Sequence, residues 1–137
     1  MRQRKTTPTW SSSASGPRPT RVLIESADPA LAVSDFGAFA AAGMDVALCH
    51  GPEHTPAECP VVRGEPCQLA AEADVILFDL GPAGEPVLEA GRRLYPGTPV
   101  VVRGGLPGAA AEGCSLLPAN TSVGGQISAI RRAADQG

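Results

Sequence analysis

The chain has 137 residues, enough for one domain, and its aromatic fraction of 4% means that aliphatic side chains must fill the core. From residue 22 onward it carries a formal charge of −8, from fourteen acidic residues and six arginines. This acidic body argues against nucleic-acid binding by the domain, because neutralising phosphates needs a basic face. The sequence contains neither a run of about 18 apolar residues nor an apolar stretch behind its N-terminal basic residues. We therefore expect a cytoplasmic protein that makes no membrane contact.

The N-terminal part divides into a tail and the start of a fold. Residues 1–20, rich in Ser, Thr, Pro and basic side chains, are predicted to be a disordered tail, and 21–137 to be the folded domain. A short buried strand over 21–24 leads to a helix with Asp28 as N-cap and Pro29 at its first position. Four side chains are predicted to line the buried face of this helix: Leu31, Phe36, Phe39 and Ala40.

The rest of the chain alternates strands and helices. A second strand is predicted over 45–49, followed by a loop over 50–65 that has too many Pro and Gly residues for a regular helix. Residues 75–79 are almost wholly apolar, which is typical of a central strand in a parallel sheet. The other predicted elements are helices over 66–73, 85–94 and 123–134 and strands over 99–102 and 115–117. This alternation predicts a parallel sheet covered by helices on both faces.

The order of these segments resembles bacterial response-regulator receiver domains, the CheY-like family. Four segments carry the resemblance, in order and spacing: Val22-Leu23-Ile24 with the turn to Asp28-Pro29, Asp74 to Leu80, Arg92 to Val102, and Leu117-Pro118. The resemblance spans about residues 21–134. It implies an α/β, flavodoxin-like three-layer fold with a five-stranded parallel sheet of order 2-1-3-4-5. It also implies a functional crevice at the carboxyl ends of the strands and a role in signal transduction of the two-component kind.

In receivers, two acidic residues after the first strand and an aspartate after the third hold Mg²⁺, and that aspartate accepts the phosphoryl group. By resemblance, Asp79 takes the acceptor position. Ser26 and Ala27 stand where the acidic pair belongs, which leaves Glu25 and Asp28 as a residual acidic turn. With fewer carboxylates, we do not expect Mg²⁺ to bind.

Receivers also use a hydroxyl residue after the fourth strand and a lysine after the fifth to bind the acyl phosphate. By resemblance these positions fall on Gly104 and Leu117, and the only lysine of the chain is Lys5, in the tail. Asp79 is therefore expected to be an inactive acceptor. Glycines and prolines after the fourth strand leave about one helical turn before the fifth, so dimerisation in the usual receiver manner is not expected.

Three thiols and both histidines of the chain lie within nineteen residues: Cys49, His50, His54, Cys59 and Cys67. Three interpretations stay open for this segment. The cysteines are ordinary thiols, or Cys59 and Cys67 form a redox pair across a turn-rich segment, or thiolate and imidazole ligands bind Zn²⁺. No other cofactor is expected.

No nucleophile–base–acid triad, phosphate loop or dinucleotide fingerprint is present, so we do not expect an enzyme. The first hypothesis is a stand-alone, degenerate receiver-like regulatory protein that contacts a protein partner without normal phosphorylation. The alternative is a thiol- or metal-based sensor that uses the Cys49–Cys67 loop, and a third hypothesis is a single-domain response regulator phosphorylated at Asp79. The partner, the pathway and the oligomeric state stay open.

Overall fold

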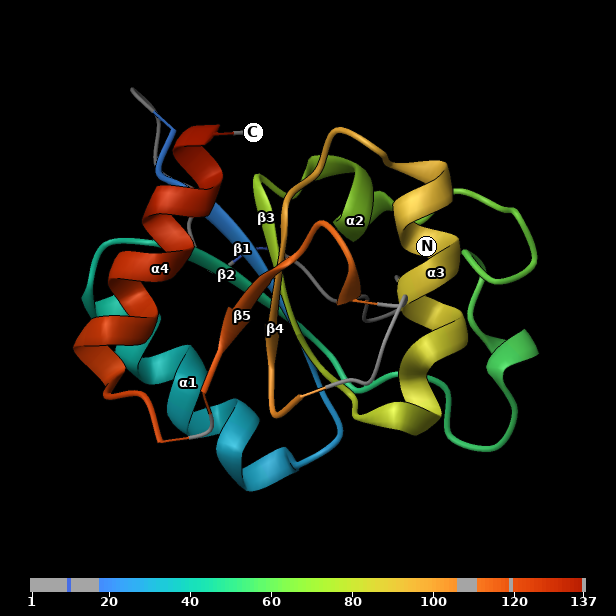
Figure 1. Cartoon of the computed structure of the whole chain (residues 1–137), viewed down its shortest axis with the longest axis horizontal. Helices are drawn as coiled ribbons and strands as arrows, with labels where there is room; N and C mark the ends of the chain where they lie inside the picture. The colour runs from blue at the N-terminus through green and yellow to red at the C-terminus, as the bar shows by residue number, and fades with distance from the viewer. Residues whose placement is uncertain (1–9, 11–17, 106–110, 119, 137) are drawn as a thin grey trace, which may run out of the picture.

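A computed structural model of the protein describes Trp10 and residues 18–105, 111–118 and 120–136. Five parallel strands form one sheet in the order β2-β1-β3-β4-β5, which confirms the predicted topology (Figure 1). The strands are β1 (Arg21–Ser26), β2 (Asp45–Cys49), β3 (Val75–Asp79), β4 (Val100–Arg103) and β5 (Ser115–Leu117). The helices are α1 (Pro29–Ala41), α2 (Gln68–Glu72), α3 (Glu85–Leu94) and α4 (Val123–Gln136).

The sheet separates two apolar cores. Helices α1 and α4 cover one face, and α2 and α3 cover the other (Figure 1). Alternate residues of the central strand β3 supply both cores: Val75 and Leu77 pack on the α1 side, Ile76 and Phe78 on the α3 side. The unbroken apolar run of β3 follows from this burial on both faces.

Helix α1 begins as the sequence predicts, and three of the four residues predicted on its buried face, Phe36, Phe39 and Ala40, pack in the core. Asp28 is its N-cap, and the carboxylate accepts hydrogen bonds from the backbone N–H groups of Ala30 and Leu31. The side chain of Leu31, predicted to be buried, is 38% exposed, whereas Asp35 is only 6% exposed. The prediction was wrong for Leu31, and it did not include Asp35, whose carboxylate binds an arginine of β4 inside the protein.

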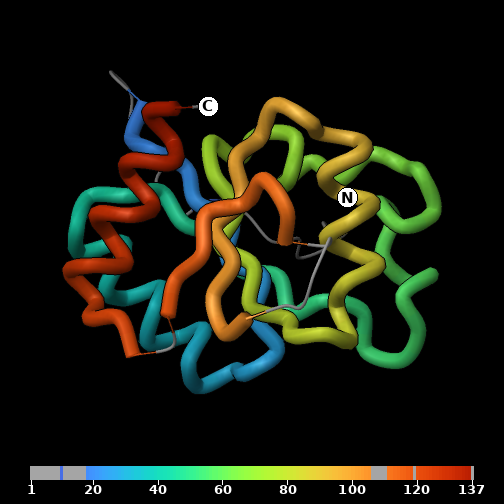
Figure 2. Tube along the Cα trace, in the orientation of Figure 1, coloured from blue at the N-terminus to red at the C-terminus, as the bar shows by residue number. Residues whose placement is uncertain are grey.

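The sheet face beneath α2 and α3 is covered unevenly. Helix α2 has only five residues, and the segment 50–67 that precedes it contains one 3₁₀ turn, Pro56–Glu58. This segment runs past the outer side of α3 (Figure 2) and contributes one buried apolar side chain, Val61. Most of the predicted helical turn between β4 and β5 falls on residues 106–110, outside the described residues.

Part of the predicted tail is attached to the domain. The indole N–H of Trp10 donates to the Glu72 carboxylate at 3.0 Å, and the Arg21 guanidinium lies 5.2 Å from the centre of the indole ring. Arg18 makes two hydrogen bonds to the carboxylate of Asp74. Residues 1–9 and 11–17 of the predicted disordered tail lie outside the described residues.

Candidate functional site

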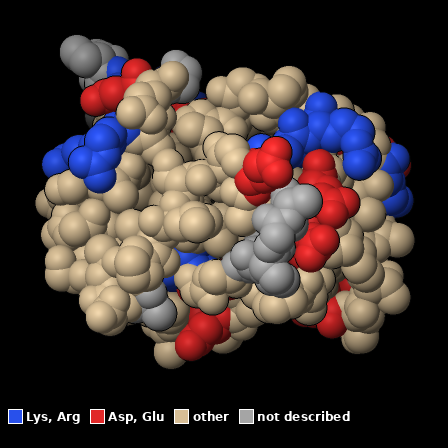
Figure 3. Space-filling view, viewed as in Figure 1, with Lys and Arg blue, Asp and Glu red and all other residues tan. Residues whose placement is uncertain are grey.

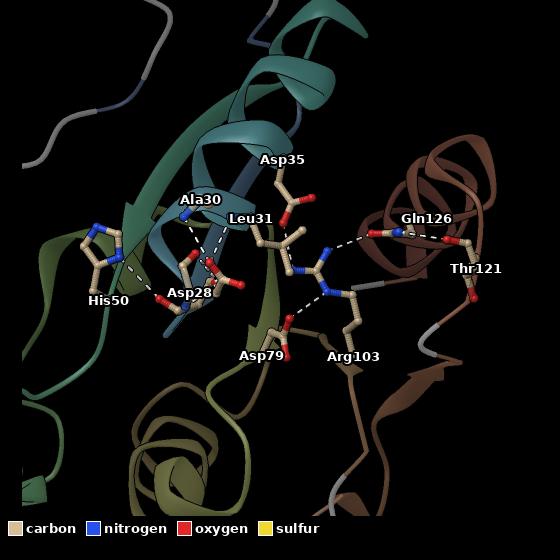
Figure 4. A network of polar contacts seen from close by, with 10 residues as sticks. Asp28, Ala30, Leu31, Asp35, His50, Asp79, Arg103, Thr121 and Gln126 are labelled. Atoms are coloured by element: carbon tan, nitrogen blue, oxygen red, sulfur yellow. Dashed lines mark hydrogen bonds and ion pairs between the residues drawn. The ribbon is translucent and has the colours of Figure 1, made fainter.

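The carboxyl ends of the central strands form the candidate site. Ser26 and Asp79 are direct neighbours at the ends of β1 and β3, and Arg103 is the last residue of β4. Because parallel strands end at the same edge of a sheet, their last side chains converge there. Figure 4 shows Asp79 and Asp35 directed at the guanidinium of Arg103.

The guanidinium of Arg103 is held by three elements at once. Its Nε donates to Oδ2 of Asp79 at 2.9 Å, and one terminal nitrogen donates to Oδ2 of Asp35 in α1 at 2.7 Å. The other terminal nitrogen donates to Oε1 of Gln126 in α4 at 2.8 Å, and the amide group of Gln126 donates to the carbonyl of Thr121. The arginine side chain is only 6% exposed, so these contacts fix a cation in the interior.

The charges of this cluster depend on one another. Loss of hydration lowers the pKa of Arg103, but its hydrogen bonds to Asp35 and Asp79 outweigh that effect and raise it, so the guanidinium stays cationic. Burial raises the pKa of Asp79, and the guanidinium opposes this rise. The guanidinium is the cation that both carboxylates share, so its removal would leave the buried Asp35 carboxylate without a partner of opposite charge.

Gly104 brings the backbone close to Asp79. Its φ of +90° lies in the left-handed region that favours glycine, and a Cβ atom built there would lie 2.9 Å from Oδ1 of Asp79. The receiver-type hydroxyl residue predicted to be missing at this position would clash with Asp79 in the present arrangement. Gly104 therefore fits beside the Asp79 carboxylate that Arg103 holds, and a residue with a side chain does not.

The residual acidic turn predicted from Glu25 and Asp28 is divided between two places. The Asp28 carboxylate caps α1 and is close enough to Asp79 to contribute to the rise of its pKa. Glu25 instead lines a cavity on the α3 side of the sheet. The separation follows from strand alternation, since Ser26 faces the opposite side of the sheet from Glu25.

The position of the receiver lysine is apolar in structure as well as in sequence. Leu117, at the end of β5, is 8% exposed and belongs to the core beneath α1 and α4. Its neighbour across the pair of strands is Arg103. A cation is present at this edge of the sheet, but it comes from β4 and binds two aspartates.

The fold brings the three cysteines of this segment to one cavity, but not the two histidines. Cys49, Cys59 and Cys67 are free thiols that line the same cavity as Glu25. His50 faces the carbonyl of Ser26 at 3.3 Å (Figure 4), and His54 pairs with Glu58 on the surface. Within the described ranges, no group of three or more Cys, His, Asp or Glu residues is arranged to hold a metal ion.

Sequence reasoning missed Arg103, Asp35 and Gln126, which make up most of the site. One signal was available: Arg103 directly follows three valines of a strand predicted to be buried, and a buried arginine needs an acidic partner. The identity of that partner was not readable, because Asp35 lies 68 residues away along the chain.

The face in Figure 3 is mostly uncharged. At its upper right, a contiguous group of basic atoms lies beside groups of acidic atoms. None of the helices in the described ranges is both long and apolar enough to cross a bilayer.

Comparison with known proteins identifies the fold. No protein-family model matches the chain, and no curated protein sequence matches it. Several solved structures of receiver domains do match the chain. A CheY-like receiver domain protein from Methanospirillum hungatei aligns with a TM-score of 0.65 at 18% identity, covering 86% of this chain and 95% of the other.

Two further structures agree. Chemotaxis protein CheY4 from Vibrio cholerae gives a TM-score of 0.62 at 14% identity, covering 84% of this chain and 98% of its own. The receiver domain of Francisella response regulator 1452 gives 0.61 at 18% identity, with coverages of 87% and 98%. The chain therefore has the fold of the CheY-like response-regulator receiver domains.

Proposed function

We propose that the protein is a receiver-like regulatory module that acts by contacting a partner protein and does not use phosphorylation at Asp79. Its fold is that of signalling domains, which supports a regulatory role. The observation that carries the proposal is the ion pair between Arg103 and Asp79. It places a fixed cation against the carboxylate that would have to accept a phosphoryl group.

The ion pair opposes phosphorylation in two ways. The Asp79 oxygen bound by Arg103 cannot attack phosphorus without giving up a hydrogen bond of 2.9 Å. Arg103 cannot move aside to follow a phosphoryl group, because Asp35 and Gln126 hold its other two nitrogens. A hydrogen bond between charged groups contributes roughly 1.5–3 kcal/mol, which phosphorylation would have to offset.

The same arrangement opposes Mg²⁺ binding. Mg²⁺ takes oxygen ligands in octahedral geometry and is usually held by one or two carboxylates. Here the Asp79 carboxylate faces a guanidinium, and the Asp28 carboxylate accepts two backbone hydrogen bonds at the start of α1. A divalent cation beside Arg103 would also meet like-charge repulsion. We infer that the network replaces the ion and fixes one conformation of the domain.

A phosphoryl mimic tests this proposal in solution. Amide spectra of the full chain are recorded by heteronuclear NMR with Mg²⁺ alone and with Mg²⁺ plus beryllofluoride, which binds an acceptor aspartate as a phosphoryl analogue. The proposal predicts unchanged signals for residues 79–81 and 103–105 in both cases. Saturable shifts of these signals that Asp79→Asn abolishes would overturn it.

A second candidate function rests on the cysteines. Three thiols line one cavity, which supports a thiol-based sensor built on Cys59 and Cys67. Cys49 is the weakest of the three for this role, because burial and the nearby charge of Glu25 raise the pKa of its thiol to about 11. Since metal ligation also requires the thiolate, the same effect disfavours a zinc site that includes Cys49.

A further inference from the structure

A cavity of about 180 Å³ lies between the sheet and α3, and we call it the Glu25 cavity. Its floor is formed by side chains of β1, β3 and β4 that include Leu23 and Ile76, and its walls by α3 and the segment 50–67. The lining is mostly apolar. Its polar residues are Glu25, Glu58, Arg92 and the three cysteines.

The cavity follows from the way this sheet face is covered. Helix α2 is five residues long, and Ala70 is its one buried residue. The preceding segment contains several prolines and places only Val61 in a fully buried position. A short helix with a small buried side chain and an irregular segment do not fill the space that a longer helix with large apolar side chains would fill.

Glu25 is a carboxyl group with no partner on this face. It stands on β1 between Cys49 of β2 and Phe78 of β3, and no described residue donates a hydrogen bond to it. The lining also includes Arg92, but its guanidinium lies 2.8 Å from the position of a Cβ atom on Gly113, at another site. Burial raises the pKa of Glu25 to about 7, with no basic group lowering it.

The shape and charge of this site select a class of ligand. A dry cavity of about 150 Å³ is large enough to hold benzene, so a ligand of similar size with a short polar arm fits here. Glu25 is half-buried, and a carboxylate in such a place is stabilised by a cation that forms a charge-assisted hydrogen bond. A neutral ligand leaves the carboxylate uncompensated, and an anion is repelled by it.

We propose that the Glu25 cavity binds a small apolar monoamine, whose ammonium group pairs with Glu25 while its apolar body fills the space beside α3. The inference is independent of the function proposed above, because Asp79 and Arg103 lie at the end of the sheet and take no part in it. The ammonium group of the ligand supplies the positive charge that no described side chain places beside Glu25.

Three probes of similar size test this proposal on the unmodified full chain. Benzylamine, benzyl alcohol and benzoate are titrated at neutral pH, with heteronuclear NMR following the amide signals of Cys49, Val61 and Leu88. Benzylamine is expected to give saturable shifts at these residues and to bind at least tenfold more tightly than benzyl alcohol. Benzoate is expected to give no shifts there. Equal binding of amine and alcohol, or no saturable binding of benzylamine, would overturn the proposal.

A matched pair of variants identifies the carboxyl group involved. Glu25→Gln keeps the shape of the side chain and removes the charge, and it is expected to weaken benzylamine binding at least tenfold while leaving benzyl alcohol binding unchanged. Glu53→Gln removes an exposed carboxylate of the neighbouring segment and is expected to leave both unchanged. Equal weakening by both substitutions would show that benzylamine follows the net charge of the protein and would refute a specific pair with Glu25.

Discussion

Arg103 of β4 donates from Nε to Oδ2 of Asp79 at 2.9 Å, and this bond joins the ends of two neighbouring strands. By its resemblance in sequence, Asp79 is predicted to take the position that accepts the phosphoryl group in receivers. The cation paired with it is Arg103, whose other two nitrogens bind Asp35 and Gln126.

Loss of Arg103 is expected to destabilise the protein strongly. Arg103→Met leaves the buried Asp35 carboxylate without its cation, and the free energy of unfolding should fall by about 3–5 kcal/mol, measured by urea denaturation. Arg63→Met, which removes an exposed pair with Glu65, should leave it nearly unchanged. The double substitution Arg103→Met and Asp35→Leu should recover most of the loss. A loss from Arg103→Met as small as that of Arg63→Met would contradict the buried network.

Gly104 is expected to tolerate no side chain. Gly104→Ala combines a φ of +90° with a contact of 2.9 Å between the new Cβ atom and Asp79, so we expect a loss of about 1–3 kcal/mol in the free energy of unfolding. Gly37→Ala is the matched control, because it lies within α1 with nothing within 4 Å of the new methyl group. It should stabilise the protein by about 0.5–1 kcal/mol. A change of the same sign in the free energy of unfolding for both substitutions would contradict the close approach of Gly104 to Asp79.

The stability of the protein is expected to depend on pH through Glu25. Its pKa is about 7 when folded and near 4.5 when unfolded, so between these values the folded state keeps a proton that the unfolded chain has lost. The stabilisation is complete below about pH 4.5 and is lost as the pH rises through 7. Its upper limit is about 3 kcal/mol, reduced because the side chain is partly exposed.

Comparison with Glu25→Gln isolates this effect from other carboxylates. The variant should match the wild type in urea denaturation at pH 4 and exceed its stability by about 1–3 kcal/mol at pH 8. A constant difference between the two proteins across this range would show that Glu25 ionises normally in the folded state.

The cysteines are expected to differ in reactivity. At pH 8 a thiol with a pKa of about 11 has roughly a hundredfold less thiolate than an ordinary one, so Cys49 should be alkylated slowly in a peptide-mapped time course. If the sensor hypothesis holds, mild oxidation should remove two thiols, and either Cys59→Ser or Cys67→Ser should prevent this. Four thiols that stay titratable after oxidation would eliminate the sensor.

Much of the fold was predictable from the sequence because its signals are local. The apolar run at 75–79 and the cap Asp28-Pro29 depend on neighbouring residues, and both elements lie where they were predicted. The site was less predictable because it is assembled from distant parts of the chain. The position of Asp79 could be inferred from its place after β3, but its partner Arg103 could not, since the register of β3 and β4 sets that contact.

The wrong assignment of Leu31 on α1 and the omission of Asp35 have the same origin. Apolar periodicity favoured Leu31 over Asp35 on the buried face, because an isolated carboxylate is costly to bury. In the structure the ion pair with Arg103 offsets this cost, but the sequence does not show that Arg103 lies beside Asp35. For Glu25 and the cysteines, the sequence indicated a cluster, but not that strand alternation directs Glu25 away from Asp79 and toward the thiols.

Whether Asp79 can be phosphorylated is tested by measuring the intact mass of the protein after incubation with acetyl phosphate and Mg²⁺. Transfer to Asp79 would form an acyl phosphate with release of acetate. Because Arg103 occupies the Asp79 carboxylate and no lysine lies at the end of β5, we predict an unchanged mass in both the wild type and Asp79→Asn. A gain of one phosphoryl group in the wild type that is absent in Asp79→Asn would contradict the account.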